Sequence, residues 1–198
     1  MSVPRIVISG LGFLTSIGND RAAVSTSRRE LRTGIERHEF FAGADLPVKV
    51  AGTIKGFARL RHLLRREGVE LTIVSDNFDL ILAPILRRTG FADVACRANH
   101  LELAAERLWP SFPFGNPDCP VCAHCKKTHF LPPNDDARQV IFIGDGRSDI
   151  CPSLHADIVF AKDSLLAHLQ AARIPCVAYR DLTQVAGALE KHLHAHQN

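Results

Sequence analysis

At 198 residues the chain is about the size of one domain with an elaboration, and its 46% hydrophobic content is enough for a sizeable core. No apolar run is long enough to span a membrane, and the first residues lack the apolar core of a signal peptide, so we expect a cytoplasmic protein with no membrane partner. The formal net charge of +3 is too small to indicate nucleic acid binding, and one Trp and one Tyr leave little for base stacking.

The N-terminal segment begins with an apolar run that is typical of a buried strand. Arg5 to Ser9 reads Arg-Ile-Val-Ile-Ser, and Gly10 and Gly12 follow it. In order and spacing, the first 57 residues resemble the opening of a β-ketoacyl-acyl carrier protein synthase. In that family this part is a first strand, turn and helix of a thiolase-like fold, and it carries none of the catalytic Cys and His residues. The resemblance therefore implies no condensing activity.

A helix and a strand are expected next. The helix covers about Ala58 to Glu67 and ends at Gly68, a residue typical of helix C-termini. The strand from Leu71 to Val74 is apolar and leads into Ser75. Residues 76–86 then read as a second helix that opens on Asp-Asn.

Three of the six cysteines gather in a short segment rich in Cys and His. They are Cys119, Cys122 and Cys125, with His124 or His129 as a fourth candidate ligand. Three sulfurs and one imidazole suit a tetrahedral zinc ion, whereas the alternative is a Cys-rich loop without metal. A disulfide is less favoured than zinc in a reducing cytosol. We expect the loop from Pro110 to Cys125 to protrude.

The segment from Gln139 to Asp149 is the most informative part of the chain. Val140 to Ile143 has the length and composition of a strand buried on both faces, and glycines in the turn after it let the backbone bend sharply. Asp145 and Asp149 would then face the edge of the sheet where ligands bind in open α/β folds. Carboxylate oxygens suit magnesium. The alternative is a plain turn in which Asp149 caps the next helix.

The remaining elements complete an α/β pattern. Helices are expected near Asp163 to Ala172 and Asp181 to Leu193, with a strand near Cys176 to Ala178 between them. The sequence therefore predicts a three-layer α/β domain with a mostly parallel sheet.

A strand-end Ser75, then Lys126, then the Gly-Asp-Gly-x-x-Asp segment that ends at Asp149 form an ordered set. In these residues the chain resembles the haloacid dehalogenase (HAD) superfamily, in the branch of phosphoserine phosphatase and the methionine-salvage phosphatase. The resemblance covers about residues 58–198. It implies a Rossmannoid domain that hydrolyses a small phosphorylated metabolite with magnesium.

The resemblance also implies a role for each residue of this set. Ser75 would hydrogen-bond the phosphoryl oxygens, and Lys126 would neutralise their charge. Lys127 is the alternative to Lys126, because two adjacent lysines leave the alignment with the family's lysine ambiguous by one residue. Asp145 would ligate magnesium directly, and Asp149 would support the shell of the metal or its waters.

The nucleophile of these phosphatases is missing from the sequence. They begin with a strand that ends in Asp-x-Asp, and no such motif precedes Ser75 here. Two interpretations follow: a phosphatase whose activity is impaired, or a catalytically dead relative, including a fusion or truncation product, that at most binds phosphate or a protein. If the chain does turn over substrate, Asp76 and Asp79 are the nearest other nucleophile candidates.

The order of the two resemblances suggests how the chain is organised. We expect residues 1–57 to form a segment that packs on or into a HAD-like domain of residues 58–198. In this hypothesis Arg5 to Ser9 replaces the lost first strand of the phosphatase. Gly10 and Gly12 then fall where the two catalytic aspartates would have been.

Overall fold

The computed structural model describes most of the chain from residue 56 onward and a few segments before it. The described residues are 5–9, 26, 29–30, 35–37, 50–52, 56–104, 107–118, 122–130 and 139–195. The chain divides into two compact units, one of Met1–Leu11 with Leu64–Ala178 and one of Gly12–Leu63 with Tyr179–Asn198. The candidate site lies wholly within the first unit. The domain boundary at residue 57 stays a prediction.

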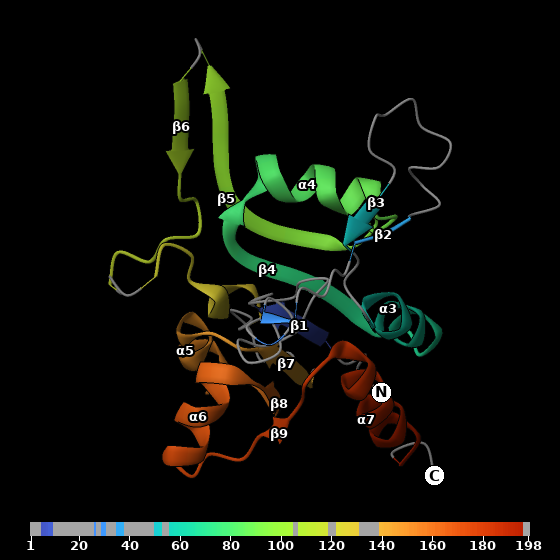
Figure 1. Cartoon of the computed structure of the whole chain (residues 1–198). Coiled ribbons are helices and arrows are strands. Elements are labelled where there is room, and N and C mark those ends of the chain that lie inside the picture. Colours follow the sequence, from blue (N-terminus) through green and yellow to red (C-terminus); the bar gives the residue numbers. More distant parts are fainter. Residues whose placement is uncertain are drawn as a thin grey trace. The chain divides into compact units, whose positions relative to one another are not determined.

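The first unit contains a seven-stranded sheet of order β6-β5-β4-β1-β7-β8-β9 (Figure 1). Its strands are β1 (Arg5–Ser9), β4 (Glu70–Phe78), β5 (Ala95–Ala104), β6 (Arg107–Ser111), β7 (Val140–Gly144), β8 (Ile158–Ala161) and β9 (Val177–Ala178). All neighbouring pairs are parallel except β5 with β6. The expected α/β fold of Rossmannoid type with a mostly parallel sheet is therefore confirmed.

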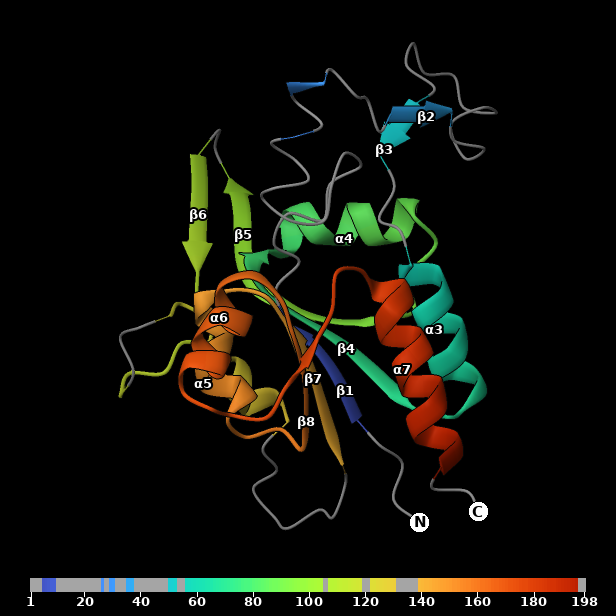
Figure 2. The same cartoon turned by 60° about the horizontal axis from the view of Figure 1, so that its bottom comes forward.

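Strand β1 lies in the middle of this sheet. It pairs in parallel with β4 on one side, where Ile6 is opposite Leu71, and with β7 on the other, where Ile6 is opposite Ile141 (Figure 2). This is the position expected for Arg5 to Ser9. The order of strands reverses at β1, and such a switch point is where open α/β sheets bind ligands, at the carboxyl ends of the strands. Gly10 and Gly12, which follow β1 in the sequence, lie outside the described residues.

The core of the first unit forms around β7, whose five residues are all buried, as expected for an internal parallel strand. The Phe142 ring lies 6.0 Å from the Phe130 ring and is fully buried. Helix α6 (Asp163–Ala171) contributes buried Leu165 and Leu169 to the same cluster. This packing fixes the carboxyl end of β7, which leads into the turn that contains Asp145 and Asp149.

The bounds of the helices before and after β4 in the sequence agree with the expectation in part. Helix α3 (Phe57–Arg66) ends before Gly68, which has a φ of +66° and so takes the left-handed backbone that suits glycine. Helix α4 begins at Asp79 and ends at Arg88, so the expected helix start at Asp76 was wrong. Residues 76–78 instead continue strand β4 through an irregularity in its register with β5, where Ser75 is opposite Ala98 and Phe78 is opposite Asn99.

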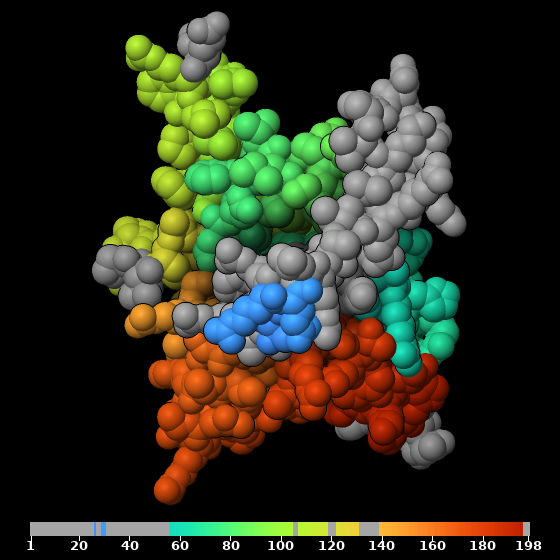
Figure 3. Space-filling model, in the orientation of Figure 1, coloured from blue at the N-terminus to red at the C-terminus, as the bar shows by residue number. Residues whose placement is uncertain are grey.

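The antiparallel hairpin of β5 and β6 was not expected from the sequence. Pro110 was predicted to begin a protruding loop, but it belongs to β6, opposite Leu101. Every residue of β6 is exposed, and the hairpin projects from the unit in the space-filling view (Figure 3). Between this hairpin and β7 lies η1 (Lys126–His129), a short 3-10 helix.

The turn after β7 leads into η2 (Arg147–Asp149) and the short helix α5 (Ile150–Ser153). In the second unit, β2 (Ile35–Arg37) pairs antiparallel with β3 (Val50–Gly52), and α7 (Leu182–Ala195) is its longest described helix. Among the described residues, no helix has the length and apolar character needed to cross a membrane.

Candidate active site

The candidate site lies where β1, β4 and β7 reach their carboxyl ends. β1 ends at Ser9, which is opposite Val74, so Ser75 is the next residue of β4 at this edge. β7 ends at Gly144, and Asp145 follows it directly. The pairing of parallel strands thus brings residues about seventy positions apart in sequence to one edge of the sheet.

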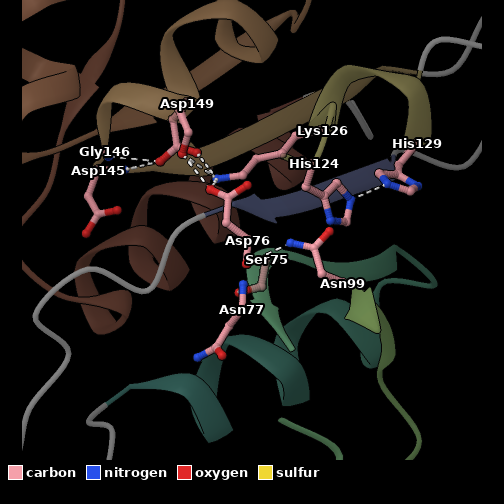
Figure 4. A network of polar contacts seen from close by, with 11 residues as sticks. Ser75, Asp76, Asn77, Asn99, His124, Lys126, His129, Asp145, Gly146 and Asp149 are labelled. Atoms are coloured by element: carbon pink, nitrogen blue, oxygen red, sulfur yellow. Dashed lines mark hydrogen bonds and ion pairs between the residues drawn. The ribbon is translucent and has the colours of Figure 1, made fainter. Parts of the chain in front are cut away.

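The turn after β7 is organised by the carboxylate of Asp149, which is 0% exposed. Its Oδ2 accepts hydrogen bonds from the backbone N–H groups of Asp145 and Gly146, both at 2.9 Å (Figure 4). A Cβ on Gly144 would lie 2.9 Å from this carboxylate, so glycine is needed for the close approach. Asp149 is followed by a helix but makes no side-chain cap for it, so the plain helix-cap alternative does not hold.

Lys126 binds the other oxygen of the same carboxylate. Its Nζ donates to Asp149 Oδ1 at 2.8 Å and to Ser148 Oγ at 2.9 Å. Asp76 Oδ2 lies 3.1 Å from the same nitrogen, and Ser148 Oγ donates to this oxygen at 2.8 Å. The Lys126 side chain is only 2% exposed, so its charge depends on these partners. Among the described residues Lys127 contacts neither Asp149 nor Asp76, which identifies Lys126 as the lysine of this cluster.

Asp145 has different surroundings, although it is only four residues from Asp149. Its carboxylate points away from the Lys126 cluster (Figure 4), and in the described part of the chain its nearest charged partner is Lys162 Nζ at 3.9 Å. Burial, together with the nearby Asp149 charge, raises the pKa of Asp145 to about 6. A buried carboxylate whose one cationic partner is distant suits a divalent cation, which would supply the missing positive charge and take the carboxylate oxygens as ligands.

Ser75 lies beside this cluster without touching Lys126 in the described contacts. Its Oγ accepts a hydrogen bond from the Asn77 backbone N–H at 3.2 Å. The backbone oxygen of Asp76 accepts one from the Asn99 amide at 2.8 Å. Asn99 is buried, so the segment that carries Ser75 is held firmly in position. Of the four residues predicted for the site, Lys126 and Asp149 are in contact, Asp145 is joined to Asp149 through its backbone, and Ser75 precedes a residue that contacts Lys126.

A pair of histidines near the cluster was predicted only as a source of zinc ligands. The Nε2 atoms of His124 and His129 are 2.6 Å apart, so one ring donates to the other. The Phe114 ring contacts both, with centroids at 4.8 and 4.6 Å. Burial lowers the pKa of His124, and burial followed by the effect of His124 lowers the pKa of His129 to about 4. Both shifts favour the neutral form of the rings, which pack against Phe114.

The zinc prediction finds no support in the described residues. Cys125 is buried, and its nearest described polar partner is the Asn116 amide, 3.9 Å from the sulfur. Cys119 lies outside the described residues. In the part of the chain that the structure describes, no three His, Cys, Asp or Glu side chains are grouped so that they could hold a metal. A zinc site at Cys119, Cys122 and Cys125 stays a prediction.

Sequence reasoning missed two residues of the cluster, Ser148 and Asn99. Ser148 lies inside the recognised turn, and the only signal for it is a hydroxyl one residue before Asp149. Asn99 comes from β5, a strand that was not predicted. Asp76 had been considered only as a helix start and as a substitute nucleophile, and its contact with Lys126 was not foreseen.

The comparisons with known proteins agree with this geometry. The sequence profile of haloacid dehalogenase-like hydrolases matches residues 5–151, about three quarters of the chain. The chain belongs to this family. The match begins at β1, ahead of the residue 58 from which the resemblance was expected to start. This family match and the relatives and structures described below do not show a ketoacyl synthase at the N-terminus, so that resemblance stays a prediction.

Two curated relatives are named as 2-hydroxy-3-keto-5-methylthiopentenyl-1-phosphate phosphatase. The protein from Brevibacillus brevis is 29% identical over 149 residues, which cover 74% of this chain and 67% of the relative. The protein from Bacillus velezensis is 27% identical over 142 residues, covering 68% of this chain and 58% of the relative. The chain thus matches about three fifths to two thirds of the length of these phosphatases of a small phosphorylated metabolite.

Solved phosphoserine phosphatases share the fold. A phospho-aspartyl intermediate analogue of phosphoserine phosphatase has a TM-score of 0.54 at 16% identity, with 95% of this chain and 99% of that chain covered. A substrate-bound phosphoserine phosphatase complex gives 0.55 at 17% identity, with 95% and 99% covered. A probable phosphoserine phosphatase from Vibrio cholerae gives 0.57 at 14% identity, with 98% and 66% covered. At these identities the likeness shows the fold alone.

Proposed function

We propose that the chain is a phosphomonoesterase that acts on a small phosphorylated metabolite at the carboxyl edge of the sheet. The observation that supports the proposal most is the buried ion pair between Lys126 and Asp149, since it holds an ammonium group near the carboxyl edge of the sheet. Ser75 and Lys126 would bind the phosphoryl oxygens. Membership of the hydrolase family and the named activity of the two relatives support this reading. A phosphorylated keto-enol like that of the relatives is the first substrate to test.

Magnesium is the expected cofactor. The carboxylates of Asp76, Asp145 and Asp149 face the two ammonium groups of Lys126 and Lys162, so this edge is not positive enough to attract a phosphate dianion by itself. A divalent cation on Asp145 would make the net charge of this edge favourable for a phosphate dianion. When bound, it would also neutralise the negative charge that develops on the phosphoryl oxygens. Asp149 would contribute indirectly, because both of its oxygens already accept hydrogen bonds from Lys126 and the turn.

One observation favours a second candidate, phosphate binding without hydrolysis. The central strand β1 leads into Ser9-Gly10-Leu11-Gly12, which contains no carboxylate. An aspartyl nucleophile is therefore missing from the strand that carries it in related phosphatases, and loss of one member of a catalytic unit costs about 10⁴ in rate or more. In this case we propose that residues 1–57 replace the first strand and cap of a phosphatase of which residues 58–198 are the remainder.

Hydrolysis of p-nitrophenyl phosphate by the purified chain, with and without magnesium, separates the two candidates. For a phosphomonoesterase we expect magnesium-dependent turnover that falls by about 10²-fold or more in Lys126→Met and in Asp145→Asn. Lys127→Met is the matched control and should keep the activity, because Lys127 does not contact the cluster. A wild-type rate at background, together with recovery in the double variant Gly10→Asp, Gly12→Asp, would establish the second candidate. A wild-type rate that survives Lys126→Met would contradict the proposed site.

A further inference from the structure

The surroundings of Lys126 leave little room for an incoming anion. An ammonium group has three N–H donors. Two of them donate to Ser148 and Asp149, and the Asp76 carboxylate lies 3.1 Å from the same nitrogen. The lysine is thus surrounded by three oxygen acceptors from its own chain, and two of these are charged. A phosphoryl oxygen that binds Lys126 must displace one of them.

Asp149 is poorly suited to be displaced. It is fully buried, and the backbone N–H groups of Asp145 and Gly146 also depend on it. Losing it from Lys126 would leave a buried charge without its partner, which is costly. Ser148 is neutral and belongs to the same turn. Asp76 is the exception, because its side chain is 40% exposed and can exchange its contacts for water.

The position of Asp76 is set by the backbone, while its carboxylate remains able to move. The Asn99 amide donates to the Asp76 backbone oxygen, which fixes where the side chain begins. Among the described residues, the partners of the carboxylate are Lys126 and the Ser148 hydroxyl, at 3.1 and 2.8 Å. In Figure 4 it points from the end of β4 toward Lys126 and Asp149, on the side where Ser75 lies.

We propose that Asp76 is an internal competitor for the phosphoryl group, a residue that lowers the affinity of the site for anions by occupying the accessible side of Lys126. The inference rests on the proposed function, in which Lys126 and Ser75 bind phosphate. A carboxylate and a phosphoryl group carry charge of the same sign and offer the same kind of oxygen acceptor. Phosphate therefore meets both an occupied donor and a repelling charge, and it binds fully only after Asp76 turns away.

Phosphate binding to the purified full-length chain tests this inference. The titration by calorimetry uses inorganic phosphate near neutral pH at a fixed ionic strength of about 0.15 M, with magnesium and without it. For Asp76→Asn we expect the phosphate Kd to fall by about tenfold, because Asp76 is partly exposed and its repulsion of a nearby anion is close to the value in water. Asp76→Ser should act in the same direction, and Lys126→Met should abolish binding in either background.

Asp79→Asn is the matched control. Asp79 lies three residues from Asp76, carries the same charge and is similarly exposed, but it pairs with His100 and not with Lys126. It should leave the phosphate Kd unchanged. Urea unfolding of each variant shows whether a change in Kd comes with a change in fold stability, which a purely structural role of Asp76 would require.

Each other outcome has a clear meaning. If Lys126→Met abolishes phosphate binding but both Asp76 variants bind like the wild type, the anion site stands and the competitor role is wrong. If Asp79→Asn tightens binding as much as Asp76→Asn, the effect is one of general charge, and the competitor role is again wrong. If no variant binds phosphate at tens of millimolar, about the upper limit for a useful site, both the inference and the proposed phosphate site are refuted.

Discussion

Asp145 and Asp149 lie on the same turn and are both buried, but their negative charges are compensated by neighbouring groups to different extents. Asp149 accepts three hydrogen bonds, from Lys126 and from two backbone N–H groups, so its charge is compensated within the chain. Asp145 has only Lys162 at 3.9 Å among the described charged residues, and its pKa is raised to about 6. A buried charge that is fully paired contributes to the fold, whereas one that lacks close partners costs stability and is best explained by a ligand.

Removing the compensated carboxylate should have the largest effect. In Asp149→Ala, the Lys126 charge stays buried and two backbone N–H groups lose their acceptor, so we expect a loss of about 3–5 kcal/mol in unfolding free energy. Urea titration followed by circular dichroism measures it. Asp149→Asn, which keeps oxygen acceptors for the turn, should lose less. A loss below about 1 kcal/mol for Asp149→Ala would mean that the pair behaves like a surface ion pair.

Neutralising the uncompensated carboxylate should have the opposite sign. Asp145→Asn removes a buried charge that lacks a close partner, so in metal-free buffer we expect a gain of up to about 3 kcal/mol at pH 7. The folded pKa lies above the unfolded one, so the penalty is fully present above about pH 6 and disappears as the pH falls below about 4. Urea titrations at pH 7 and pH 4 measure the difference. A variant that is destabilised at pH 7 would show that Asp145 is a structural group.

The sequence predicts those features of the site that adjacent residues determine, and it fails for those that depend on contacts with distant segments of the chain. The apolar run of β7 and the two glycines of the turn after it are local signals, so the strand and the turn were predicted, while the metal roles of Asp145 and Asp149 stay predictions. Asp76 was assigned to a helix because Asp and Asn are typical of helix starts. Its actual place is the irregular stretch of β4 between Ser75 and Phe78, and these two residues pair with β5, a strand about twenty residues away that local composition does not reveal.

The choice between Lys126 and Lys127 shows the same limit. Neighbouring lysines are equivalent in composition, and only the direction of η1 turns Lys126 inward toward Asp149. The central position of β1 was predictable because an internal parallel strand has a continuous apolar run. The hypothesis that Gly10 and Gly12 fall where the catalytic aspartates would have been concerns residues outside the described ones, so it stays a prediction.

The histidine pair should give a smaller effect that depends on pH. The folded pKa of His129, about 4, lies below the value of 6.5 for an exposed histidine, so the unfolded chain binds the proton more readily. The free energy of unfolding is therefore expected to fall as the pH drops from about 6.5 to about 4. Because the ring is only half-buried, the fall should be smaller than the ~1.4 kcal/mol per pH unit that binding of one proton allows. His129→Gln should flatten this part of the profile in urea titrations. An unchanged slope in the variant would assign the pH dependence to other groups.

The exposed pair of Asp79 and His100 should give the smallest effect, although its 2.6 Å distance is shorter than that of Lys126 and Asp149. Both side chains are about half exposed, so water and salt screen the attraction and distance alone is a poor guide to its contribution. The hydrogen bond to Asp79 raises the pKa of His100, so any stabilisation is present below about pH 6.5 and is lost as the pH rises through the raised value. We expect Asp79→Asn to leave the urea midpoint at pH 7.5 unchanged within error and to lower it slightly at pH 5.5. Asn keeps the oxygen that accepts from the Leu80 and Leu101 backbone, so a large loss at both pH values would come from the lost charge and would show that exposure does not separate the two pairs.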